Sequence, residues 1–179
     1  MAKKGGTYEK EKSQSRVTQL EAKTRICIVK IVLEDNIDNQ FDSLIKIIEE
    51  ATIFKEYDFV VLAKMIENML PIYNGNSKYD ELYELITNKL TTRKSEIQRA
   101  EMYLKKSKIL SSNGKHYDAI NTLGKCLTLL YKEETNGKLL ETYINIGGNF
   151  ESIGLLYAAK NYYIAAISLF IEIFFKEND

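Results

Sequence analysis

The C-terminal half of the chain carries one residue pattern twice, forty residues apart. The clearer copy orders aromatic, aliphatic and small residues around a glycine, as Tyr143, Ile146, Gly147, Phe150, Gly154, Ala159, Tyr163 and Ala166. The upstream copy is Tyr103, Ser107, Leu110, Gly114, Ala119, Leu123 and Cys126. Small residues let two helix backbones approach closely, while larger ones fill the grooves beside them. The pattern therefore predicts helical hairpins, which bury their apolar faces by stacking on one another.

Two weaker copies precede these. They keep the spacing of the pattern, but mostly bulky aliphatic residues stand where the clearer copies have small ones. One consists of Ile66, Met69, Leu70, Tyr73, Leu82 and Ile86, with Lys89 in place of the last small residue. The other consists of Ile28, Val29, Val32, Phe41, Ile45 and Ile48. Short Asn-Gly turns, as at Asn74-Gly75, separate the helices within such a pair.

The predicted fold is all-α, because one proline in 179 residues leaves too little turn punctuation for a β-sandwich or barrel. Eight helices are expected as four antiparallel pairs, over about 15–54, 57–91, 95–132 and 138–176. Stacked with a constant rotation, the pairs would form a right-handed superhelix. We expect a single domain over 14–179, preceded by a flexible tail over 1–13 that lacks apolar periodicity.

Two segments complicate the helix assignment. Ile26–Leu33 is rich in β-branched residues, but the three- and four-residue spacing around it favours a helix. Pro71 is expected to kink or end the helix that begins near Tyr57, since proline removes a backbone donor and crowds the preceding turn.

The sequence offers no recognisable catalytic or metal-binding constellation. His116 is the single histidine and follows a turn, where a packing role is expected. Cys27 and Cys126 are not spaced as a metal site or disulfide framework, and we expect both to be reduced and packed. The stretch 145–149 contains two glycines but lacks the strand and lysine of a phosphate loop, so helix packing explains it better. We expect no enzyme activity, no metal and no cofactor.

Charge gives a weak indication of partners. Acidic and basic residues balance at 25 each, which provides no overall field for nucleic acid or an anionic membrane. The first thirty residues are locally basic, so nucleic-acid binding is an alternative, although Tyr8 is the one aromatic there for base stacking. The N-terminus lacks the apolar core of a secretory signal, and a cytoplasmic location is expected.

The last predicted helix is apolar on more than one face. From Tyr162 to Phe175 it has few polar positions, whereas repeat arrays usually end in a helix with a polar outer side. The end face, marked by Phe170, Phe174 and Phe175, is therefore expected to pair with another chain or with further repeats. A membrane span is a weaker alternative, because Lys160, Asn161 and Glu172 interrupt the run.

The residues of the repeated pattern resemble the tetratricopeptide-repeat (TPR) family, well over about 101–176 and weakly over about 22–91. The resemblance implies a concave groove, lined by the first helix of each pair, that binds a peptide or helix of another protein. Carried onto this chain, the groove residues are Lys23, Ile26, Lys30, Lys64, Glu67, Glu101, Leu104, Lys108, Ser111, Glu141, Ile144, Gly148 and Glu151. The lysine-asparagine clamp that some members use for a terminal carboxylate is not reproduced at these positions.

These observations lead to a non-catalytic protein-interaction module, alone or as part of a larger protein, as the first functional hypothesis. The alternative is an oligomerisation or spacer domain that acts through the apolar C-terminal helix. Binding of nucleic acid or membrane is a weaker expectation in both cases.

Overall fold

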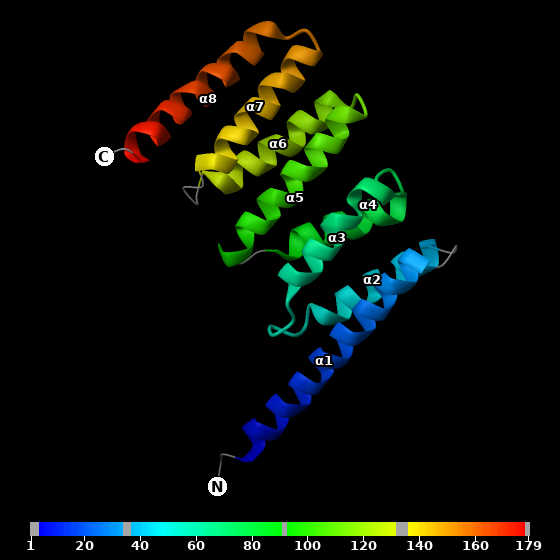
Figure 1. Cartoon of the computed structure of the whole chain (residues 1–179). Coiled ribbons are helices and arrows are strands. Elements are labelled where there is room, and N and C mark those ends of the chain that lie inside the picture. The colour runs from blue at the N-terminus through cyan, green and yellow to red at the C-terminus, as the bar shows by residue number, and fades with distance from the viewer. Residues whose placement is uncertain (1–3, 34–36, 91–92, 132–135, 178–179) are drawn as a thin grey trace. The chain divides into compact units, whose positions relative to one another are not determined.

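The computed structural model describes residues 4–33, 37–90, 93–131 and 136–177. These residues form eight helices and no strand, so the all-α prediction is confirmed (Figure 1). The chain divides into two compact units, Met1–Lys89 and Leu90–Asp179, and each is described by itself. Stacking of both into one continuous array stays a prediction.

Unit 1 contains the first four helices. They are α1 (Lys4–Leu33), α2 (Ile37–Ala51), α3 (Phe59–Tyr73) and α4 (Ser77–Lys89). The prediction of a tail is wrong for the part that the structure describes, because α1 already begins at Lys4. The absence of apolar periodicity was a poor guide there, since the run 9–14 consists of Glu, Lys, Ser and Gln, and Glu, Lys and Gln are good helix formers. The β-branched segment Ile26–Leu33 is helical as expected.

In unit 1, α2 packs against both α1 and α4, and α3 packs against α4. The aromatic centre is Phe41 of α2, which meets Tyr73 edge-on at 5.4 Å between ring centroids and Tyr79 at 5.7 Å. Tyr79 is fully buried and donates its hydroxyl hydrogen to the carbonyl oxygen of Ile66. Burial of these large rings, together with the buried aliphatic side chains around them, stabilises this unit.

The ends of α3 show one feature that the sequence predicted poorly and one that it missed. Pro71 lies inside the last turn and the helix continues to Tyr73, so the expected stop comes two residues late. At the other end Asp58 is the N-cap, and its Oδ1 accepts hydrogen bonds from the backbone of Val60 at 2.9 Å and Val61 at 3.3 Å.

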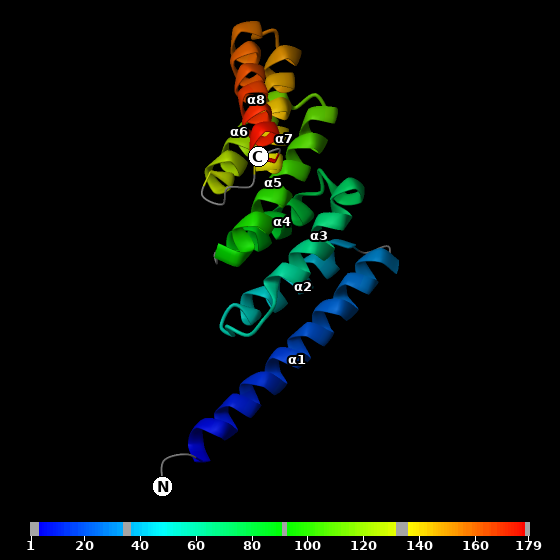
Figure 2. The same ribbon diagram turned by 60° about the vertical axis from the view of Figure 1, so that its left-hand side comes forward.

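Unit 2 contains α5 (Arg93–Ser112), α6 (His116–Leu130), α7 (Asn136–Ser152) and α8 (Leu156–Glu177). Each helix packs against the next one, and α5 also contacts α7 (Figure 2). One hydrophobic cluster joins α5, α6 and α7, with Tyr103, Leu123, Leu130 and Ile146 among its buried members. Tyr162 of α8 stacks on Phe150 of α7 at 5.6 Å.

The two hairpin turns of unit 2 are the same structure repeated forty residues apart. At the first turn, the Lys115 N–H donates to the Leu110 carbonyl oxygen and the Gly114 N–H donates to the Ser111 carbonyl oxygen. At the second turn, the Leu155 N–H donates to the Phe150 carbonyl oxygen and the Gly154 N–H donates to the backbone carbonyl oxygen of Glu151. These are Schellman motifs, and the glycines adopt φ values of +74° and +79° that favour glycine. The forty-residue repeat of the sequence is thus also a repeat of the backbone.

Unit 1 packs its helices differently from unit 2. In unit 2 the second helix of one hairpin contacts the first helix of the next, α6 against α7. In unit 1 the main contact between hairpins joins the two second helices, α2 and α4. The weaker pattern in the N-terminal half therefore accompanies a different packing.

Candidate interaction surfaces

The predicted groove residues of unit 2 come together along α5 and α7. Lys108 Nζ lies 2.5 Å from Glu141 Oε1, and the Lys138 ammonium pairs with the Glu101 carboxylate. All four side chains are partly exposed. Each pair joins α5 to α7, so the charges of this face already neutralise one another within the chain.

Two of the predicted groove residues lie in the interior. Leu104 is 6% exposed and belongs to the cluster of unit 2, and Glu67 in α3 is 5% exposed. Their assignment to a binding surface is corrected: a helix position that faces a neighbouring helix is covered by it. Lys23, Ile26, Lys30 and Lys64 of unit 1 are exposed.

A polar contact closes one end of the α5 and α7 face. Asn149 is 3% exposed, and its Oδ1 accepts a hydrogen bond from the Ser111 hydroxyl and lies 2.9 Å from His116 Nδ1. Accepting at Oδ1 requires His116 to carry its hydrogen on Nδ1. This contact matches the packing role expected for His116. The remaining groove residues, Ile144, Gly148 and Glu151, line the same helix, with Ile144 49% exposed.

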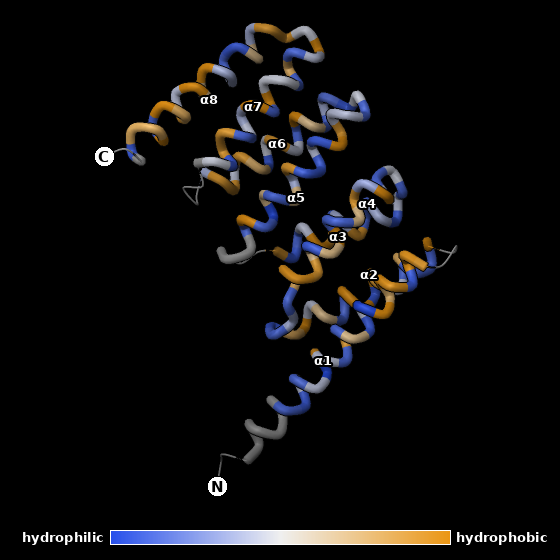
Figure 3. Tube along the Cα trace, in the orientation of Figure 1, coloured by the Kyte–Doolittle hydropathy of each residue, from blue (hydrophilic) through white to orange (hydrophobic). Residues whose placement is uncertain are grey.

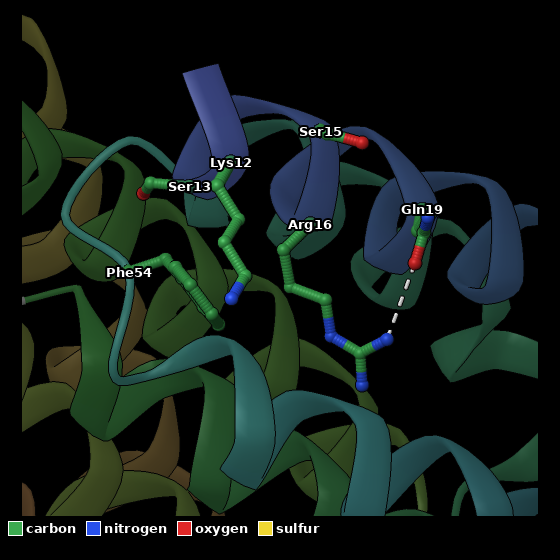
Figure 4. A pocket seen from close by; sticks show the side chains of 6 residues that line it. All are labelled: Lys12, Ser13, Ser15, Arg16, Gln19 and Phe54. Atoms are coloured by element: carbon green, nitrogen blue, oxygen red, sulfur yellow. Dashed lines mark hydrogen bonds between the residues drawn. The ribbon is translucent and has the colours of Figure 1, made fainter. Parts of the chain in front are cut away.

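Unit 1 has a shallow groove of about 410 Å³ between the N-terminal half of α1 and Phe54 (Figure 4). It is lined by Lys12, Ser13, Ser15, Arg16, Gln19 and Phe54. Arg16 pairs with the Glu50 carboxylate and donates to Gln19 Oε1 at 3.2 Å. With its guanidinium paired with a carboxylate, Arg16 offers little to an anion such as nucleic-acid phosphate.

The largest exposed apolar surface of unit 2 follows α8, where hydrophobic residues occur along the whole helix (Figure 3). Eight large side chains on this helix are about half exposed or more: Leu156, Tyr157, Ile164, Ile167, Phe170, Ile171, Phe174 and Phe175. The opposite side packs on α7 and includes Ala159, Tyr162, Ala166 and Leu169. The eight residues are called the α8 face below.

A comparison with α6 at the forty-residue offset shows what the α8 face lacks. Leu130 of α6 is 1% exposed and shares a cluster with Leu139 of α7, whereas its counterpart Phe170 is 56% exposed. Gly124 of α6 is exposed to solvent, and its counterpart is Ile164. The α8 face is therefore apolar at Phe170, whose counterpart on α6 is covered by α7. It is also apolar at Ile164, whose counterpart on α6 is a glycine.

A groove of about 480 Å³ lies on the other flank of α8. It is lined by Leu130, Tyr131, Leu139, Tyr143, Ala165, Ser168, Leu169 and Glu172. The hydroxyls of Tyr131 and Tyr143 are hydrogen-bonded to each other there. Burial, together with that hydrogen bond, raises the pKa of Tyr143 above its ordinary value. The phenol is thus held in its neutral form and is a poor acid or base.

The described residues include no group of three or more His, Cys, Asp or Glu side chains that could hold a metal ion. Cys27 and Cys126 form no disulfide and are both buried, as predicted. Burial raises the pKa of Cys126, with the Thr142 hydroxyl opposing that effect. A buried neutral thiol is a packing residue and a poor nucleophile.

Among the described residues, one helix, Leu156–Lys176, is long and apolar enough to cross a membrane by length and composition. Its inner side packs on α7, where Tyr162 contacts the rings of Tyr143 and Phe150.

Sequence reasoning named Phe170, Phe174 and Phe175 as the end face and missed the isoleucines of the same face. Ile164, Ile167 and Ile171 stand at three- and four-residue steps, and that spacing was the signal available in the sequence. Lys138 was also missed as the partner of Glu101, because a pairing between two helices is invisible until their register is known.

Comparison with known proteins found no match, either to a protein-family model or to a curated protein sequence. The resemblance to TPR proteins rests on the residues of this chain.

Proposed function

We propose that this chain is a non-catalytic, TPR-like repeat scaffold that binds another protein chain, with the α8 face as its main docking surface. The repeat assignment is supported by the two matching turns at Gly114 and Gly154 and by the order of packing from α5 to α8. TPR proteins bind other proteins through surfaces that their stacked helices leave open.

The exposed α8 face is the observation that carries this proposal. Soluble proteins rarely leave a contiguous apolar patch of this size in water, and such patches mark interaction sites. At the forty-residue offset, exposed Ile164 replaces Gly124 of α6, and exposed Phe170 replaces the buried Leu130, so the apolar exposure at these two positions belongs to α8 and not to the repeat.

Capture of partners by the immobilised chain tests the proposal. Ile167→Glu should abolish capture and leave the melting temperature unchanged, because Ile167 is 59% exposed. Asn121→Glu, on the exposed side of α6, is the matched control and should capture partners as the unaltered chain does. Equal capture by Ile167→Glu would remove the α8 face as the docking surface.

The α5 and α7 face is the second candidate, supported by Ile144, which is 49% exposed beside the charged pairs. It would bind a helix or peptide by exchanging internal ion pairs for intermolecular ones. Reversal of both charges, Lys108→Glu with Glu141→Lys, keeps the internal pair but inverts the pattern presented to a partner. Loss of capture in this variant alone would assign the function to this face.

A further inference from the structure

A regular seam, formed by residues of the α8 face and Lys160, runs along the exposed side of α8. Exposed residues follow one another at alternating steps of three and four, as Tyr157, Lys160, Ile164, Ile167, Ile171 and Phe174. This is the spacing of the a and d positions of a coiled coil, in which each apolar side chain inserts between four residues of a facing helix. The seam lies opposite the side of α8 that packs on α7, so a facing helix would reach it without moving α7.

The seam is symmetric about its centre, between Ala165 and Ala166. If a second α8 runs antiparallel along it, Ile164 faces Ile167 of the other copy, and Tyr157 faces Phe174. Each of these contacts then occurs twice, because Ile167 of the first copy also faces Ile164 of the second. An isologous two-fold interface requires this reciprocity. A parallel copy would instead place Lys160 opposite Lys160.

Charge agrees with the antiparallel register. Lys160 is the charged member of the seam and would lie opposite Ile171 of the second copy, one residue from Glu172. Glu172 pairs with Lys176 of the same helix at 2.6 Å on the flank beside the seam. The antiparallel register thus keeps the two Lys160 side chains apart, whereas a parallel register would set them against each other.

The available area is also sufficient. Eight side chains of this size, half exposed or more, offer roughly 900 Å², against about 800 Å² per partner in a standard interface. A membrane surface is a poorer match, because an interfacial helix has a charged opposite side and the opposite side of α8 is the core of unit 2.

We propose that the occupant of the α8 face is a second copy of this chain, with the two α8 helices antiparallel about a two-fold axis at the level of Ala165 and Ala166. The inference rests on the proposed function, since it names the partner for the same surface.

The mass of the full chain by light scattering is the first test. The account predicts a dimer that becomes a monomer in Ile164→Glu, and Asn121→Glu should remain dimeric. In the antiparallel register Ile164 and Ile167 face each other, so Ile164→Glu combined with Ile167→Lys should restore the dimer. A monomeric wild-type chain would overturn the inference.

Thiol cross-linking then tests the register. Tyr157 and Phe174 are separated by about 25 Å along one helix, so a short cross-linker distinguishes the arrangements. A mixture of Tyr157→Cys and Phe174→Cys chains should cross-link between the two variants, whereas neither variant alone should do so. The wild-type chain, whose two cysteines are buried, is the control. Cross-linking of Tyr157→Cys with itself would contradict the antiparallel arrangement.

The outcomes separate this inference from the proposed function. A monomer whose capture of a different protein is lost in Ile167→Glu overturns self-association and keeps α8 as a docking surface. A monomer that binds phosphatidylcholine vesicles, with binding lost in Ile167→Glu, overturns self-association in favour of a lipid surface. A monomer that binds neither overturns the inference together with the proposed function.

Discussion

The ring of Tyr163 in α8 lies directly over the backbone of Gly147 in α7. A Cβ built on Gly147 would be 2.7 Å from Tyr163 Cε1 and 2.9 Å from Cδ1, closer than real Cβ atoms approach. The ring is held there by its hydroxyl, which donates to Glu151 Oε2 at 2.7 Å. In the upstream copy of the pattern, Ser107 stands in place of Gly147 and Leu123 in place of Tyr163. The large ring of Tyr163 therefore requires glycine at 147, and the two differences between the copies belong together.

Gly147→Leu should destabilise the chain because the new side chain must displace the Tyr163 ring. We expect a loss of about 1 to 3 kcal/mol from overpacking, which exceeds the gain of about 1 kcal/mol in helix propensity. Thermal unfolding measures the difference. Gly124→Ala is the control: nothing lies within 4 Å of its added Cβ, so it should raise the melting temperature. A neutral Gly147→Leu would mean that the ring does not occupy this position.

Ala159→Asp should unfold unit 2 or weaken it severely. Ala159 is 2% exposed on the side of α8 that faces α7, and a carboxylate there would be buried without a cation. We expect a loss of several kcal/mol in urea unfolding. Asn161→Asp, two residues away and exposed, should change the stability by less than about 0.5 kcal/mol. Similar behaviour of both variants would show that the inner side of α8 is assigned wrongly.

The ionisation of Tyr79 should make unit 1 less stable above pH 10. Burial raises the pKa of Tyr79 above its ordinary value of 10.0, so its contribution is complete below that pH. As the pH rises further, the unfolded chain releases the proton first, and stability falls by about 1.4 kcal/mol per pH unit.

Tyr79→Phe separates this effect from other groups that titrate at high pH. At neutral pH it should cost about 1 kcal/mol, because the hydrogen bond to Ile66 is lost. Above pH 10 the difference from the wild type should shrink. Tyr117→Phe, at a side chain that is 71% exposed, should change neither value. An unchanged difference from pH 7 to 11 would contradict burial of the phenol.

The ion pair between Lys108 and Glu141 should contribute little to stability. Both side chains are about half exposed, and such pairs are typically worth less than about 1 kcal/mol and weaken in salt. A double-mutant cycle with Lys108→Ala and Glu141→Ala measures the coupling. A coupling that exceeds about 2 kcal/mol and persists in high salt would show that this pair, rather than hydrophobic packing, holds α5 beside α7.

Much of the fold followed from spacing in the sequence. The predicted pairs 57–91, 95–132 and 138–176 agree with the observed hairpins to within two residues at each end, and Gly75, Gly114 and Gly154 mark the turns inside them. The start of α1 was missed because a charged helix has no apolar period to detect. The extra contact of α2 with α4 could not be predicted, since it depends on which side of each helix meets the next.

The interaction surfaces were harder to predict than the helices. Repeat register placed Lys108 and Glu141 on facing helices correctly, but it placed Leu104 on the surface, where the structure buries it beneath neighbours. The repeat register gives the position of a residue along its helix. An error of one residue in that register rotates the side chain by about 100° around the helix axis, which is enough to exchange surface and interior. The α8 face was predicted in part because its excess of apolar residues is visible without knowing any rotation.

Carbene footprinting read out by mass spectrometry tests the central claim most directly, because it measures which side chains a partner covers. The account predicts that labelling of the peptide containing Ile164, Ile167 and Ile171 falls as the chain becomes concentrated or meets its partner. Labelling of Ile26 and Val29 on α1, which are exposed to a similar degree, should stay constant. Constant labelling of α8 together with protection of Ile144 would contradict the claim and place the docking surface on α5 and α7.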